Sequence, residues 1–208
     1  ANNTVTLSGI TSFSRWTVGE SCLNPATAGT ISSSHTICYN STATTLTGTA
    51  PTGYFGDLEY NWQQSTMSSS AGFTFITGAT GSSYNPGALT QTTWFKRLAK
   101  TTCADVWPAS GTSNVVEVTV RSQFTSGTIS STGESICFNT SPGTAISNVT
   151  AASGGDGTIA YSWRSSADSY TNAIAGATNS TYTPTGPLTA QQSYRRYAND
   201  GACTTTPS

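Results

Sequence analysis

Short stretches of alternating apolar and polar residues run along most of the chain. The clearest one contains residues 60–62 (Tyr-Asn-Trp), and a second of the same form contains residues 161–163 (Tyr-Ser-Trp). A period of two residues is typical of a β-strand with one buried face. We therefore predict that Trp62 and Trp163 lie at the centres of two similar cores.

The sequence around each tryptophan is repeated. Equivalent residues are separated by 98 (Gly29 to Gly127) to 101 positions (Trp62 to Trp163). The other paired landmarks are Ile37-Cys38 with Ile136-Cys137, Tyr84 with Tyr182, Arg97 with Arg196, and Cys103 with Cys203. A constant offset of this size indicates a tandem repeat whose unit is one small domain.

Each repeat has the strand pattern of a β-sandwich. In the first repeat the predicted strands are near residues 29–32, 44–49, 58–64, 73–77, 82–85, 92–100 and 115–120, separated by Gly, Ser, Pro and Asn clusters. We predict an all-β protein of two tandem immunoglobulin-like sandwiches, residues 23–121 and 122–208. Residues 1–22 form a short N-terminal β segment, which belongs to a preceding domain or docks on a neighbour.

The second repeat lacks a counterpart of the last strand of the first, residues 114–120, because only residues 204–208 follow Cys203. The strand at 193–199 should then present an open edge, which attracts other strands. Residues 3–8 of another copy resemble the absent strand, so strand addition could build a filament. The alternative is that a longer protein supplies the strand from its following residues.

Composition and charge narrow the function classes. Only 8% of the residues are charged and the net charge is −1, so the chain lacks the basic surface that binds nucleic acids. No apolar run reaches the length of a membrane span. A polar but nearly uncharged surface suits an extracellular or cell-surface location.

The cysteines also favour an extracellular location. Four of the five occupy equivalent positions, and the simplest arrangement is one disulfide per repeat, Cys38–Cys103 and Cys137–Cys203, with Cys22 outside both. Disulfides imply an oxidising compartment. Zinc is the alternative, but the chain has one histidine and no Cys-x-x-Cys spacing.

Candidate catalytic groups are scarce. His35 has no counterpart in the second repeat, and neither does the close pair Asp57 and Glu59. We therefore expect no enzyme activity and no cofactor or metal. Trp107 and Trp94 are the candidate ligand contacts, because exposed aromatic rings can stack on the sugar rings of a polysaccharide.

Several motifs of the first repeat resemble a known family. They are Ile-Cys-Tyr-Asn (37–40), Tyr-Asn-Trp-Gln-Gln-Ser (60–65), Ile-Thr-Gly-Ala-Thr (76–80), Ser-Tyr-Asn-Pro-Gly-Ala-Leu-Thr-Gln-Thr-Thr (83–93) and Ser-Asn-Val-Val-Glu-Val-Thr-Val (113–120). They resemble the immunoglobulin-like repeats of large adhesin-type surface proteins that Bacteroidetes export by type IX secretion. The resemblance implies a non-enzymatic structural or adhesive module whose partners are neighbouring domains, other copies or surface polysaccharide. The alternative is a carbohydrate-binding accessory segment of a secreted enzyme.

Overall fold

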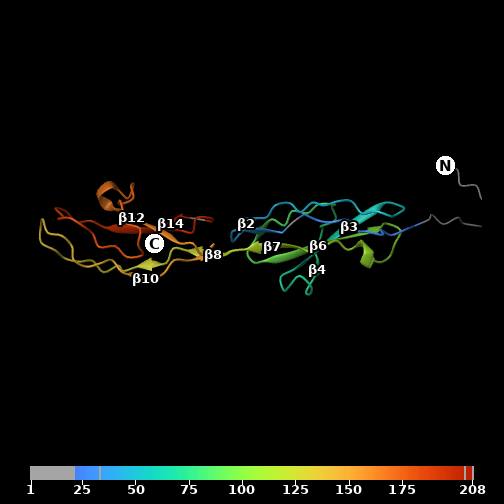
Figure 1. Cartoon of the computed structure of the whole chain (residues 1–208), viewed down its shortest axis with the longest axis horizontal. Helices are drawn as coiled ribbons and strands as arrows, with labels where there is room; N and C mark the ends of the chain where they lie inside the picture. The colour runs from blue at the N-terminus through green and yellow to red at the C-terminus, as the bar shows by residue number, and fades with distance from the viewer. Residues whose placement is uncertain (1–21, 33, 204, 208) are drawn as a thin grey trace, which may run out of the picture.

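The computed structural model describes residues 22–32, 34–203 and 205–207, the last three as backbone only. The two repeats follow each other along the long axis of the molecule (Figure 1). The described chain is all-β apart from two single 3₁₀ turns, η1 (Ala109–Gly111) and η2 (Ser166–Asp168). The prediction of a repeated all-β protein is therefore confirmed. Most of the predicted N-terminal β segment lies outside the described residues.

The first repeat is built on one five-stranded sheet. From edge to edge it contains β1 (His35–Ile37), β7 (Val116–Val120), β6 (Thr93–Thr101), β3 (Leu58–Ser65) and β4 (Thr74–Phe75). β3 and β6 form a long antiparallel ladder, β7 runs antiparallel to β6, and β1 runs parallel to β7. A separate ribbon of β2 (Ser41–Thr42) and β5 (Ala88–Leu89) pairs across the repeat.

The core of the first repeat lies on one face of this sheet. Trp62, Phe95 and Val118 are all 0% exposed, as the alternation along β3, β6 and β7 predicts. Leu46 packs against them from a second layer, where it forms a bridge with Tyr84. Several predicted strands of this second layer, such as residues 29–32, occur only as single bridges. Its backbone pairing is therefore sparser than the sequence predicts.

The second repeat has the same plan with shorter ladders. A three-stranded sheet contains β12 (Ala160–Ser165), β13 (Tyr194–Asn199) and β14 (Thr205–Pro207). Two ribbons pair β8 (Ser122–Thr125) with β11 (Ser153–Gly155), and β9 (Thr128–Ile129) with β10 (Asn148–Thr150). Trp163 is 0% exposed, and its indole donates to the carbonyl of Asn179 at 2.9 Å, as Trp62 donates to Gly81.

The prediction of an open edge along residues 193–199 is partly wrong. β14 pairs with Tyr197, Ala198 and Asn199, so that half of β13 is covered. A hairpin of this kind needs only the few residues after Cys203, and the sequence pattern of residues 204–208 gave no sign of it. Residues 3–8, the predicted donor strand, lie outside the described residues, so strand addition by them stays a prediction.

An arginine lies buried in each core, which the sequence pattern did not reveal. The Arg97 side chain donates to the backbone carbonyls of Ser82 (2.8 Å), Ala28 (3.0 Å) and Thr49 (2.6 Å). Its guanidinium lies 5.0 Å from the centre of the Tyr60 ring. Burial lowers the pKa of Arg97, but an arginine keeps its charge at any ordinary pH. The charge is therefore stabilised by carbonyl dipoles and an aromatic face.

Arg196 makes the same contacts in the second repeat. It donates to the carbonyls of Ser180 (3.0 Å), Ser126 (3.1 Å) and Thr150 (3.5 Å), and it lies 4.8 Å from the Tyr161 ring. Because both arginines tie three separate segments to the sheet, they compensate for the sparse strand pairing of the second layer.

Hydrogen bonds to Glu134 connect two loops of the second repeat. Its carboxylate accepts hydrogen bonds from the N–H groups of Thr144 (2.9 Å) and Gly143 (3.1 Å). These bonds favour the ionised form and hold the pKa of Glu134 below its ordinary value of 4.5.

We expect the contact between Glu134 and the loop to be lost only in acid. A lowered folded pKa means that the contact is fully formed above the unfolded pKa and weakens as the pH falls through the folded one. In an NMR titration the amide resonances of Gly143 and Thr144 should shift with a midpoint below 4.5. Glu134→Gln should abolish this titration. A midpoint at or above the ordinary value would contradict the assigned contact.

Candidate functional site: the disulfide-linked junction

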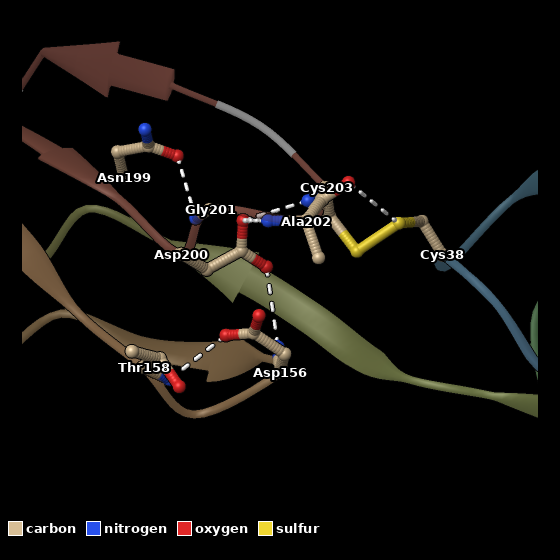
Figure 2. The surroundings of a disulfide bond; sticks show 8 residues. All are labelled: Cys38, Asp156, Thr158, Asn199, Asp200, Gly201, Ala202 and Cys203. Atoms are coloured by element: carbon tan, nitrogen blue, oxygen red, sulfur yellow. Dashed lines mark hydrogen bonds between the residues drawn. A yellow bond between two sulfur atoms is a disulfide. The ribbon is translucent and has the colours of Figure 1, made fainter.

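A disulfide joins the two repeats. Cys38, just after β1, is bonded to Cys203, which follows β13, with their Cα atoms 5.5 Å apart and 165 positions between them in sequence (Figure 2). A second disulfide joins Cys22 to Cys103, with Cα atoms 6.1 Å apart. Cys137 is unbonded and exposed. The predicted pairs Cys38–Cys103 and Cys137–Cys203 are therefore wrong, and Cys22 is not outside the disulfides.

Strand direction explains this correction. β1 is parallel to β7, so both strands finish at the junction, where the N–H of Arg121 donates to the carbonyl of Ile37 at 3.0 Å. β6 is antiparallel to β7, so Cys103 lies at the opposite end of the repeat. The 9 residues of β6 alone span roughly 30 Å at about 3.3 Å per residue. Disulfide formation needs Cα atoms within about 7 Å, which rules out the predicted bond within the repeat.

The loop that carries Cys203 is held by a buried carboxylate. Asp200 is 0% exposed, and its Oδ1 accepts from the N–H groups of Cys203 (2.7 Å) and Ala202 (3.2 Å). Its Oδ2 accepts from the N–H of Asp156 at 3.2 Å, which ties the loop to the turn after β11 (Figure 2). Cys203 therefore lies in a loop whose backbone is held in place by hydrogen bonds within the second repeat.

Gly155 makes room for this carboxylate. Its φ is +61°, and a Cβ atom built there would lie 1.6 Å from Oδ2 of Asp200. Any other residue would have to displace the carboxylate, so the Cys203 loop requires a glycine at position 155.

A hollow of about 320 Å³ lies beside the disulfide, between the repeats. Its lining comes from residues 38–41 of the first repeat and from residues 122–124 and Cys203 of the second. None of these residues carries a carboxylate, an amine or an imidazole. The polar side chains that line the hollow are amides, hydroxyls and the Tyr39 phenol, and the covalent feature of the junction is the disulfide.

The structure does not assemble the candidate catalytic residues. His35 accepts a hydrogen bond from the N–H of Thr44 at 3.3 Å, while Glu59 forms an ion pair with Lys100 at 3.0 Å. Over residues 22–32 and 34–203 and the backbone of 205–207, no group of three potential metal ligands occurs. Within the same part of the chain, no helix is long and apolar enough to cross a membrane.

The two candidate ligand contacts lie at different ends of β6. Trp94 is half-buried near its start, on the face away from the core. Trp107 lies near its end, 5.3 Å from the ammonium of Lys100 and 6.4 Å from the Phe75 ring at an angle of 42°. Two rings at this angle do not form a flat platform for a sugar.

Comparison with known protein families gives one match that covers both repeats. A domain of unknown function, DUF8696, matches residues 27–122 and again residues 125–208. The chain belongs to this family. No curated protein matches it. The two DUF8696 copies coincide with the two structural repeats, so the Cys38–Cys203 bond is a link between consecutive DUF8696 domains.

Proposed function

We propose that this chain is a non-enzymatic structural segment of an extracellular surface protein, in which consecutive DUF8696 domains are locked end to end. The observation that carries the proposal is the disulfide between the two domains. Disulfides form and persist in oxidising environments, which supports display outside the cell. The motif resemblance to adhesin-type repeats of Bacteroidetes supports the same role.

The connection between the domains supports a mechanical role. Only Arg121 separates β7 from β8, and its N–H is bonded to Ile37 at 3.0 Å. The peptide chain and the disulfide therefore cross the same junction side by side. Two covalent connections restrict both bending and twisting, whereas a single flexible linker restricts neither.

We also propose that each DUF8696 domain is an immunoglobulin-like sandwich. The five-stranded sheet of the first repeat carries the buried Trp62 on β3, an interior strand, and a second layer packs on the same face. A central tryptophan between two layers is typical of that fold. Crystallographic strand assignment of the second layer would test this.

The two disulfides should protect the chain against extension by force. Cys38 lies within the loop closed by Cys22–Cys103, and Cys103 lies within the loop closed by Cys38–Cys203. A pull between Cys22 and Cys203 is therefore carried from Cys22 along the chain to Cys38 and then directly through the disulfide to Cys203. Within this part of the chain, only the residues between Cys22 and Cys38 (38 − 22 = 16 positions) can lengthen.

Single-molecule stretching of the whole chain tests this directly. Between Cys22 and Cys203 the oxidised protein should extend to at most about 55 Å, at about 3.5 Å per residue. After reduction, 203 − 22 = 181 positions should extend to about 630 Å on the same scale. The double variant Cys38→Ser/Cys203→Ser keeps Cys22–Cys103, so its full extension should correspond to 203 − 103 = 100 positions. Full release from the oxidised protein would refute the proposed function.

A further inference from the structure

Two arginines lie directly opposite each other on the second repeat's sheet. Arg164 on β12 and Arg195 on β13 are partners in the antiparallel ladder. Their neighbours along the strands, Trp163 and Arg196, are both 0% exposed and belong to the core. Because side chains alternate along a strand, Arg164 and Arg195 lie on the outer face of the sheet, away from the core. Opposite residues of an antiparallel pair have Cβ atoms about 5 Å apart, so two positive charges are held side by side.

An aromatic ring supports each of these guanidinium groups. Arg164 lies over the Tyr197 ring at 4.4 Å, and Arg195 lies over the Tyr170 ring at 4.0 Å. Arg164 also donates through Nη1 to the carbonyl of Tyr170 at 3.2 Å, while its Nε has no hydrogen-bond partner among the described residues. Stacking fixes the position of a guanidinium and leaves N–H groups at its edge for a further acceptor.

No carboxylate neutralises the arginine pair within the described part of the chain. Neither arginine forms an ion pair there. Asp168 belongs to the same loop as the Tyr170 ring, but its carboxylate accepts from the N–H groups of Thr171 (3.3 Å) and Asn172 (3.0 Å). Like charges placed directly opposite each other destabilise a sheet. An anion bound between the two arginines would remove this repulsion.

The first repeat has half of this arrangement. Lys96 is the counterpart of Arg195, and it lies over the Phe73 ring at 4.2 Å. In both repeats the ring comes from the loop that follows the preceding long strand, β3 or β12. The ladder partner of Lys96, however, is Gln63, where the second repeat has Arg164. The paired cations therefore distinguish the second repeat from the first.

We propose that Arg164 and Arg195 bind the carboxylate groups of an acidic polysaccharide, one built from uronic acid units. A carboxylate is planar and accepts two parallel N–H bonds from one arginine, so a single uronate can bridge the pair. One exposed ion pair is worth little, but a polymer offers many carboxylates to the same site and rebinds before it diffuses away. This inference rests on the proposed display outside the cell and adds a partner to it.

Another copy of the chain is a poor source of the anion. The chain has 9 acidic residues, and no two of them are adjacent in the sequence. The closest pair is Asp57 and Glu59, and Glu59 already forms an ion pair with Lys100. A repeating line of carboxylates must therefore come from a different molecule.

The binding test uses the full oxidised chain and immobilised polygalacturonate at low salt. We expect saturable binding by biolayer interferometry, weakened at least tenfold in 0.5 M NaCl because exposed charges are screened. Methyl-esterified polygalacturonate has the same sugar backbone without the charges and should bind at least tenfold more weakly. Absence of binding, or equal binding of the two polymers, would overturn the proposal. Tighter binding of poly-glutamate or of dextran sulfate than of polygalacturonate would also overturn it, because the partner would then be an acidic protein or a sulfated glycan.

Matched variants locate the site. Arg164→Gln/Arg195→Gln should weaken binding at least tenfold, and Arg195→Gln alone, at an exposed position, at least threefold. The control Lys96→Gln/Arg121→Gln removes the same number of positive charges from other places and should change binding less than twofold. Tryptophan fluorescence checks that each variant is folded. Equal losses in the two double variants would reduce the effect to net charge and overturn the assignment.

This test is independent of the disulfide-linked junction. The variant Cys38→Ser/Cys203→Ser should bind polygalacturonate as tightly as the unaltered chain, because the arginine pair lies within the second repeat. The stretching experiment and the binding experiment can therefore fail separately. A loss of binding in this variant as large as in Arg164→Gln/Arg195→Gln would contradict the placement of the site on the β12–β13 sheet.

Discussion

Replacing Arg97 with methionine should lower the free energy of unfolding of the first repeat by about 3–9 kcal/mol. Methionine fills a similar volume but leaves three carbonyl groups, those of Ser82, Ala28 and Thr49, without their donor. Each buried acceptor left unsatisfied costs about 1–3 kcal/mol. Domains of this size are stable by only about 5–15 kcal/mol, so the variant should be close to unfolding at room temperature.

Urea denaturation followed by tryptophan fluorescence measures this loss. Arg195→Met is the matched control, because Arg195 is exposed and lies over the Tyr170 ring at 4.0 Å. Its loss should cost less than about 1 kcal/mol. Arg97→Lys should recover little stability, since one ammonium cannot reproduce the fork of the guanidinium. A cost for Arg97→Met as small as that of the control would refute the role assigned to the buried arginine.

Trp62→Ala should destabilise the first repeat by about 3–5 kcal/mol, the usual range for removing a large core aromatic residue. The indole is 0% exposed, lies 5.6 Å from the Tyr84 ring and donates to Gly81 at 2.9 Å. Alanine leaves a cavity in the middle of the core, which the hydrogen-bonded pair of β3 and β6 cannot close. Trp163→Ala should have a similar effect on the second repeat.

Differential scanning calorimetry of both variants measures the effect. Trp94→Ala is the control, because Trp94 lies on the other face of β6 and is only half-buried. It should cost well under half as much as Trp62→Ala. Trp62→Phe separates the two contributions, since it retains an aromatic ring and leaves the carbonyl of Gly81 without its donor. A smaller loss for Trp62→Ala than for Trp94→Ala would contradict the core assignment.

Local alternation was enough to place the long strands of the first repeat. Strands were predicted at residues 58–64, 92–100 and 115–120, and the structure has Leu58–Ser65, Thr93–Thr101 and Val116–Val120. The burial of Trp62 and Trp163 was also predicted correctly, because a strand with one apolar face must turn that face toward the core. The short strands β1 and β14 were missed, since two or three residues carry no period and depend on a partner strand.

The sequence by itself determined that the chain is a twofold repeat of small β domains, each with a tryptophan core and cysteines in matching places. Only the tertiary structure decided how those cysteines pair. Cys38 and Cys103 lie at opposite ends of one domain because β6 and β7 run in opposite directions. The alternation of apolar and polar residues is the same for either direction of a strand, so it could not reveal this. The local pattern also did not indicate that Arg97 is buried, because its three carbonyl partners come from distant segments of the chain.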